Sequence, residues 1–273
     1  MSVVINTNIP SITAARHFAS ARAGASNSSQ KLASGSRINT AADDAAGLTV
    51  ASKMQAQVAS TSQAIRNIND AISMANVYLS ACDEFEKIFI RGRELATQAA
   101  TGSYSADDCI NMQQEYYALT YEELLRIREA TNFNRLDVTQ HNFTTKIQMG
   151  ERVDDTLTIE FPGMGRHVMG LNAGNLETVS GARDAIVATD TGLASMAERK
   201  SKIGAFITRL EYASRNLLNV DQLTSSALST IADTDFAMET ASLARFGVLT
   251  QAASAMLAQS NQTPRYVLSL LRT

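Results

Sequence analysis

The chain has 273 residues, of which 24 are basic and 27 acidic, and its formal net charge is −3. Its charges are interspersed without a run of Lys and Arg, and no apolar run approaches the roughly 18 residues of a membrane span; both observations argue against nucleic acid and membrane as partners. Trp is absent, Phe and Tyr number only 9 and 7, and the 45% hydrophobic content owes much to Ala, which favours helices but buries little area. The composition therefore predicts long, thin helix pairs.

The first segment, residues 1–35, predicts a weakly amphipathic helix. Its bulky apolar residues include Val3, Ile5, Ile9, Ile12, Phe18 and Leu32. The last segment, 235–273, has a similarly thin apolar face, with Leu243, Phe246, Ala253 and Leu257 as its anchors. Ordering a backbone costs roughly 1–2 kcal/mol per residue, so we expect both ends to be disordered in the monomer and to fold when neighbouring copies supply the missing face.

The second segment predicts one long helix from about Ala41 to Thr101, a stretch without Pro. Gly35 separates it from the first helix, and a Thr40 to Asp43 capping box opens it, with the Thr hydroxyl accepting a free N–H. Its apolar residues recur at steps of three and four: Ile65, Ile68, Ile72, Ala75, Leu79, Cys82, Phe85 and Phe89. Such sustained spacing predicts a helix of roughly 90 Å that packs lengthwise on another helix.

A turn and a fresh helix cap are predicted at 101–108. The third helix then carries Ile110, Tyr117 and Leu124 at intervals of seven, with Tyr121 between them. We expect this apolar stripe to fold back on the second helix. Beyond it the chain becomes irregular and extended.

The middle of the chain, about 139–177, predicts a β-hairpin region. Ile147 and Met149 alternate with polar residues, as do the apolar residues of 157–161, and Gly150 with an Asp pair lies between the two runs. Helix returns after about Thr178, with a long stripe formed by Leu193, Met196, Ile203, Ile207, Leu210, Leu217, Val220 and Ile231. The expected fold is mainly α: a long antiparallel helical bundle, or coiled coil, of N- and C-terminal segments with a small hairpin region between them.

Nothing in the sequence predicts catalysis, a cofactor or a metal. His17, His141 and His167 lie on three unrelated elements, and the three Asp pairs at 43–44, 107–108 and 154–155 stand where helix caps and turns need them. Cys82 lies on the apolar stripe and should be buried, whereas Cys109 opens the third helix. Antiparallel helices place the two cysteines about 25 Å apart, beyond the roughly 7 Å Cα limit of a disulfide.

Several long segments resemble bacterial flagellin, in order along the chain: KLASGSRINTAADDAAGL at 31–48, NINDAISMANV at 67–77, TNFNRLDV at 131–138, IADTDFAMETASLAR at 231–245 and LAQSNQTPRYVLSLLR at 257–272. The resemblance covers nearly the whole chain. It lacks the family's variable outer part, because fewer than about twenty residues separate Phe161 from the returning helix. The two cysteines and the helix-interior Gly92 also depart from the family pattern.

The resemblance implies a structural subunit that assembles with itself into the extracellular flagellar filament. It implies inner-tube helices at 1–40 and 231–273, an outer-tube bundle at 41–230, and no variable outer domain. Assembly contacts are expected at the apolar residues Ile5, Ile9, Ile12, Leu243, Phe246, Leu257, Leu268 and Leu271. The implied partners are an export chaperone, the type III export apparatus, the filament cap and hook-associated proteins. The N-terminal residues lack the pattern of a secretory signal, in keeping with that route.

Around Ile90 the sequence is similar to the flagellin surface that a vertebrate Toll-like receptor senses. The matching contact residues are Arg91, Leu95 and Glu115, while Ile90 and Gly92 differ from the recognised pattern. We expect Arg91 and Glu115 to lie close together on antiparallel helices. The alternative interpretation is that both serve subunit packing and solvated helix faces.

Two other functions share the terminal helices. A hook–filament junction protein has less of the 31–48 and 267–272 motifs. A secreted enzyme or adhesin built on flagellin ends needs a longer middle segment than this chain has. Electron microscopy after nucleation separates all three.

Overall fold

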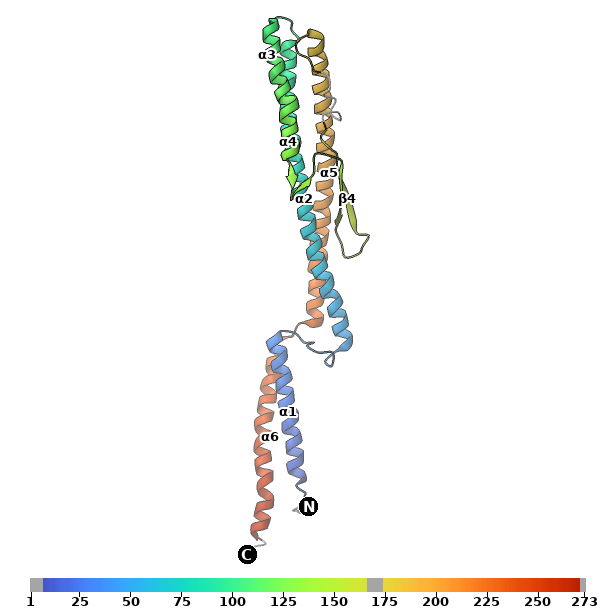
Figure 1. Ribbon diagram of the computed structural model, residues 1–273. Coiled ribbons are helices and arrows are strands. Elements are labelled where there is room, and N and C mark those ends of the chain that lie inside the picture. Colours follow the sequence, from blue (N-terminus) through green and yellow to red (C-terminus); the bar gives the residue numbers. More distant parts are fainter. Residues whose placement is uncertain (1–6, 166–173, 271–273) are drawn as a thin grey trace. The chain divides into compact units, whose positions relative to one another are not determined.

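The computed structural model describes residues 7–165 and 174–270, with side chains described up to 262. The chain forms two units (Figure 1): unit 1 comprises 1–56 with 223–273, and unit 2 comprises 57–222. The helices are α1 (Ile9–Ser34), α2 (Ala45–Ala99), α3 (Ala106–Tyr117), the π-helical η1 (Ala118–Glu123), α4 (Leu124–Ala130), α5 (Val179–Ala232) and α6 (Phe236–Leu270). The mainly α fold is as the sequence predicts.

The strands form two antiparallel pairs in unit 2. A minimal pair joins β1 (Asn132–Phe133) to β2 (Leu136–Asp137), and the predicted hairpin joins β3 (Phe143–Gln148) to β4 (Thr156–Phe161). Its register runs from Phe143 opposite Phe161 to Gln148 opposite Thr156. In β4 every second residue is buried, so one face of the hairpin packs on the helices.

The core of unit 2 lies where α2, the α3–η1–α4 helix and α5 run side by side and the hairpin covers them (Figure 1). Its largest fully buried side chains are Tyr78, Phe85, Phe89, Phe161, Ile68, Ile159, Met164, Leu176, Met196, Ile203 and Leu210. The Tyr78 and Phe161 rings meet at 5.4 Å between centroids. Most predicted stripe residues of α2 and α5 therefore face this core.

The start of α2 differs from the prediction. Asp44 caps the helix, since its carboxylate accepts the N–H of Gly47 at 2.8 Å, and α2 begins at Ala45. Thr40 does not accept a free helix N–H; its N–H and its hydroxyl both donate to Asp43, at 2.9 and 3.0 Å. The Thr40 N–H is the largest influence that lowers the pKa of Asp43. Asp43 therefore stabilises the turn before α2, and Asp44 caps the helix.

The buried face of the third helix also differs from the prediction. Of the predicted stripe only Leu124 is buried, whereas Ile110, Tyr117 and Tyr121 are exposed; the face toward the core consists of Met112, Tyr116, Thr120 and Leu124. These four residues are spaced by four, and an ideal helix of 3.6 residues per turn would rotate them off one line by about 40° per step. The π-helical segment η1 adds a residue to the turn, which keeps the four aligned. Heptad spacing could not predict this distortion.

Gly92, costly in a helix interior, has a packing reason in α2. A Cβ at this position would lie 3.3 Å from the Tyr116 ring and 3.4 Å from the Thr120 methyl group. The absence of a side chain lets the third helix approach α2 closely.

The two cysteines are free thiols, and their burial predicts different reactivity. Burial raises the pKa of the Cys82 thiol to about 12, so it stays protonated at pH 8, whereas Cys109 is half-buried on α3. In the native protein at pH 8 we expect Ellman's reagent to react with one thiol per chain, and with two after denaturation. Cys109→Ser should abolish the native reaction. Two fast-reacting thiols in the native parent would contradict the burial of Cys82.

Candidate assembly surface

The terminal helix pair, α1 with α6, forms the main body of unit 1. Asn8 caps α1 by accepting the N–H of Ser11 at 3.1 Å, and Gly35 ends the helix in the left-handed conformation with φ 69°. Two contacts fix the antiparallel register at the far end: the Asn8 amide donates to the Ser260 carbonyl at 2.9 Å, and the Ser11 hydroxyl to Asn261 at 2.7 Å.

The other end of the pair is joined by backbone hydrogen bonds. The N–H of Arg37 donates to the Ala232 carbonyl at 2.7 Å, and that of Thr234 to the Gly35 carbonyl at 2.9 Å. The Arg37 guanidinium also donates to the Ile231 carbonyl at 2.6 Å, placing a positive charge at the C-terminus of α5, where carbonyls lack helical partners. The connection between α1 and α2 is thereby held against the turn between α5 and α6.

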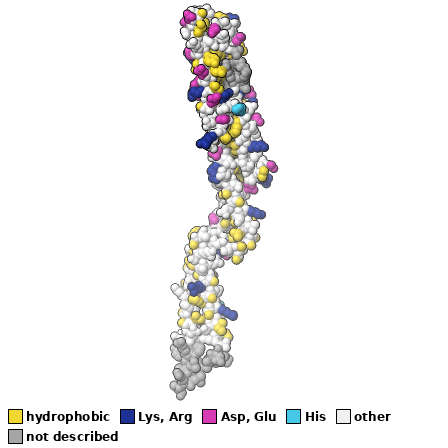
Figure 2. All heavy atoms as spheres, in the orientation of Figure 1, with side chains coloured by type: hydrophobic (Ala, Val, Ile, Leu, Met, Phe, Trp, Pro, Cys, Tyr) yellow, Lys and Arg dark blue, Asp and Glu magenta, His cyan; other side chains and the backbone are white. Residues whose placement is uncertain are grey.

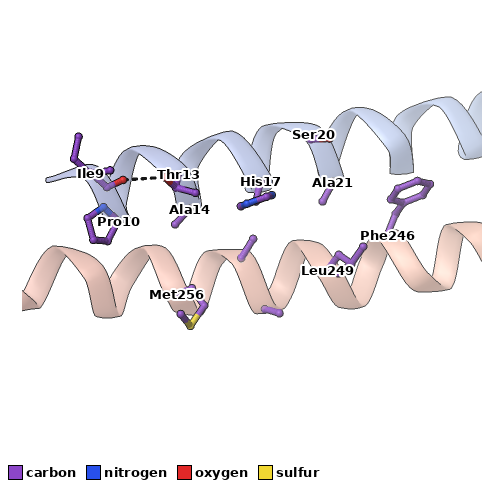
Figure 3. Close-up of a pocket in the computed structure, with 12 residues that line it drawn as sticks. Ile9, Pro10, Thr13, Ala14, His17, Ser20, Ala21, Phe246, Leu249 and Met256 are labelled. Atoms are coloured by element: carbon purple, nitrogen blue, oxygen red, sulfur yellow. Dashed lines mark hydrogen bonds between the residues drawn. The ribbon is translucent and has the colours of Figure 1, made fainter. Parts of the chain in front are cut away.

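Between these ends the pair leaves an apolar groove of about 630 Å³. Figure 3 shows Ala14, His17 and Ala21 on the α1 side, with Phe246 and Leu249 on the α6 side. Within the described part of α1 only Ala21 and Ser28 are buried. Small residues let the two helices meet, but they leave the large apolar side chains uncovered.

Both helices of the pair expose large apolar residues. Ile9 is 59% exposed and Met256 64%, and Ile12, Val248 and Leu249 are also exposed. Figure 2 shows hydrophobic side chains reaching the surface along the described part of these helices. Large apolar side chains at this exposure favour a partner surface.

The residues predicted for assembly fall into three groups. Ile9 and Ile12 are exposed, whereas Leu243, Phe246 and Leu257 are half-buried. Ile5 and Leu271 lie outside the described residues, as does the side chain of Leu268. The prediction that all of them bury on assembly stays a prediction.

Gly24 is a residue that the sequence analysis missed. A Cβ on it would lie 2.6 Å from the nearest atom of the Phe246 ring, so the missing side chain provides the seat of that ring on α1. The available signal was a Gly in the middle of a helix, where it costs about 0.5–1 kcal/mol relative to Ala and so needs a packing reason.

We expect Gly24→Ala to impair assembly because the new methyl displaces the Phe246 ring. The displaced ring can swing into the groove, so the effect falls on the surface that a neighbouring copy would cover, and the critical concentration for polymerisation should rise by up to about tenfold. Gly247→Ala is the matched control, since a Cβ there meets nothing within 4 Å. Sedimentation of filaments against monomer measures both variants. Equal critical concentrations would show that the ring does not need this seat.

The second predicted site lies in unit 2. The Arg91 guanidinium is 2.8 Å from Glu115 and 3.1 Å from Glu94, and hydrogen bonds from Arg91 to Glu115 and then Glu94 raise its pKa. The expected closeness of Arg91 and Glu115 is confirmed. Leu95, by contrast, is 2% exposed and packs in a core cluster with Met112 and Tyr116. Only the charged pair offers its side chains to solvent.

Arg199 is a further residue missed from the sequence. It is buried on α5 and donates to the Pro162 carbonyl at 2.8 Å and to the Tyr78 hydroxyl at 3.4 Å. The Tyr78 hydroxyl donates to the same carbonyl at 2.7 Å, and burial raises the pKa of Tyr78 to about 12. Its sequence position could have predicted this burial, because Arg199 lies three residues after Met196 and so falls on the apolar stripe of the helix.

In the described part of the chain no group of three or more His, Cys, Asp and Glu side chains could hold a metal ion. The same part contains no helix that combines the length and apolar character needed to cross a bilayer.

Two family models match the N-terminal and C-terminal helical parts of the chain. The family model of the bacterial flagellin N-terminal helical region matches residues 5–144, and that of the C-terminal helical region matches 186–271. The flagellin of Halalkalibacterium halodurans is 35% identical over 273 residues, covering 99% of this chain and 100% of the relative. The chain belongs to the bacterial flagellin family.

Other flagellins differ from it in length. Flagellin C of Vibrio cholerae is 28% identical over 377 residues, covering 99% of this chain and all of the relative. Because that alignment is longer than the 273-residue chain, the relative has segments that this flagellin lacks. The short length fits a flagellin without the variable outer domain.

Two solved structures resemble the flagellin fold described above. The crystal structure of Bacillus cereus flagellin matches with a TM-score of 0.51 and 26% identity, covering 56% of this chain and 88% of that one. A putative flagellar hook-associated protein from Vibrio parahaemolyticus matches with a TM-score of 0.62 over 70% of this chain, but at 10% identity. The second likeness shows the fold alone and does not favour the junction alternative.

Proposed function

We propose that this flagellin-family chain is the structural subunit of a bacterial flagellar filament, with its terminal helices in the inner tube and its 41–230 region in the outer tube. The observation that carries the proposal is the uncovered apolar groove of the terminal helix pair. Burying apolar surface contributes about 25 cal/mol per Å², so neighbouring copies gain free energy by covering it. Contacts repeated head to tail without closing produce an open helical polymer.

Polymerisation of the purified chain tests this function. Monomer mixed with short filament seeds should form filaments that negative-stain electron microscopy shows as continuous helical tubes. Circular dichroism and limited proteolysis should find less helix in the monomer than in the filament, with early trimming at both ends, since the terminal faces are thin. Monomer that remains monomeric on seeds of its own kind, at concentrations where other flagellins assemble, would refute the proposal.

The same surfaces support the proposed export and cap partners. An exposed apolar groove needs protection before assembly, which an export chaperone would supply by covering it, and the filament cap and hook-associated proteins would meet the same helices at the two ends of the polymer. The few buried residues of α1 also suit passage of an unfolded chain through a type III export apparatus. The proposed location is the extracellular filament.

We also propose recognition of the monomer by the flagellin-sensing Toll-like receptor, supported by the exposed Arg91–Glu115 pair. Arg91→Ala and Glu115→Ala should each lower monomer signalling in a reporter-cell assay by about tenfold, the scale of one lost charge-assisted contact. Arg126→Ala is the matched control, because Arg126 forms a similar exposed pair with Glu123. Filament should signal poorly if assembly covers this face. Signalling by both variants at the parent level would reject recognition and leave the filament function intact.

A further inference from the structure

The third helix of unit 2 exposes an apolar stripe at the surface. Tyr117 and Tyr121 are 45% and 39% exposed, and their rings stack at 4.8 Å with an interplanar angle of 19°. Ile110 and Leu125 extend the stripe at both ends and are exposed as well. We name these four residues the acidic tyrosine face, because the helical segment that carries them is rich in Asp and Glu.

The helical segment that carries this face is acidic. Residues 105–130 contain six acidic side chains, Asp107, Asp108, Glu115, Glu122, Glu123 and Glu129, against only Arg126 and Arg128. Four of the six have a partner: Glu115 with Arg91, Glu123 with Arg126, Glu129 with Arg128, and Asp108 in the helix cap. Glu122, next to Tyr121, is exposed and makes no ion pair with the described residues.

A face of opposite charge lies on α5 of the same unit. Arg209, Tyr212 and Arg215, at steps of three, share one side of this helix, and we name them the basic tyrosine face. Tyr212 is 64% exposed, with the Arg215 guanidinium 5.0 Å from its ring centroid, and Arg209 lies 5.9 Å from the Phe206 ring. Arg215 pairs with Glu211, but Arg209 forms no ion pair within the ranges that the structure describes.

We propose that the acidic tyrosine face of one copy docks on the basic tyrosine face of the next. Both faces offer exposed tyrosine rings, and their charges are opposite, so contact between unlike faces attracts and contact between like faces repels. The arginines can also lie over the partner's tyrosine rings. Because the two faces differ, the contact is heterologous and leaves a free face at each end of the growing polymer. This inference rests on the proposed self-assembly and names the residues that direct it.

Charge reversal tests the pairing. Glu122→Lys and Arg209→Glu each place like charges across the contact, and each should raise the critical concentration for seeded polymerisation about tenfold. In the double variant every copy carries both reversals, so the attraction is restored and the critical concentration should return to within about twofold of the parent. Asp70 is exposed on α2, which carries neither face. Asp70→Lys is therefore the matched control and should assemble like the parent.

Three outcomes decide the inference. Restoration in the double variant supports it, provided that thermal unfolding followed by circular dichroism shows all variants equally folded. If the single reversals assemble like the Asp70→Lys control, or the double variant is as impaired as the singles combined, the two faces do not meet in the filament. Tyr117→Ser gives an independent check on the aromatic part and should also assemble poorly. Failure of the parent to polymerise would instead refute the proposed function.

Discussion

Removing α6, by ending the chain after Asp235, should abolish filament formation completely while unit 2 stays folded. Without α6 the groove loses one wall, and α1 loses the contacts of Phe246, Ser260 and Asn261 that seat it and fix its register. With only Ala21 and Ser28 buried even in the pair, α1 alone cannot offset its ordering entropy. The truncated chain should therefore remain a monomer on seeds at any concentration.

Circular dichroism and urea unfolding check that the loss is confined to unit 1. Helix content should fall by the share of α1 and α6, and the urea midpoint of unit 2 should match that of unit 2 in the full chain, because the large fully buried side chains belong to unit 2. Filaments formed by the truncated chain would contradict the role of the terminal pair. A shifted midpoint would show that α6 also stabilises unit 2.

Arg199→Ala should destabilise unit 2 by about 3 kcal/mol. The substitution removes a hydrogen bond from a charged donor, worth about 1.5–3 kcal/mol, and empties a site that is 7% exposed in the structure. It also leaves the Pro162 carbonyl and the Tyr78 hydroxyl with only each other as partners, which weakens the network that holds the end of β4 against α2 and α5. For a unit of this size the midpoint of thermal unfolding should drop by about 6–12 °C.

Lys200→Ala is the matched control for Arg199→Ala. Lys200 follows Arg199 on α5 and pairs with Asp83 at 2.6 Å and Glu86 at 2.7 Å, but on the surface, where such pairs contribute about 0–1 kcal/mol. Those two hydrogen bonds raise the pKa of Lys200, so its pairs persist over the neutral range. Equal midpoints for the two variants would show that the buried network adds no more than a surface pair.

The sequence predicted the elements well where local chemistry decides them. The spacing of Ile68, Ala75 and Phe85 predicted α2, the alternation before and after Gly150 predicted the hairpin, and Ser105 caps α3 in the predicted turn with a full capping box. In each case the signal lies within a few neighbouring residues. Helix periodicity and caps act over one or two turns, so a single sequence contains them.

The face that each helix buries was less predictable. On the third helix Tyr116 and Thr120 face the core and Tyr117 and Tyr121 face solvent, although both pairs have the same spacing. Which pair is buried depends on Gly92 of α2, whose missing side chain leaves room for the Tyr116 ring, and on the π-helical segment η1. Both are properties of the packed helices.

By itself, the sequence determined that this protein consists of long helices with thin apolar faces at both ends and a hairpin between them. Only the tertiary structure decided which residues remain uncovered. It seats Phe246 on Gly24, buries Arg199 beside Tyr78, and leaves two tyrosine faces of opposite charge at the surface. The physical reason is that burial is a relation between residues far apart in the chain, set by how closely two helix backbones approach and by which turn of one meets which turn of the other.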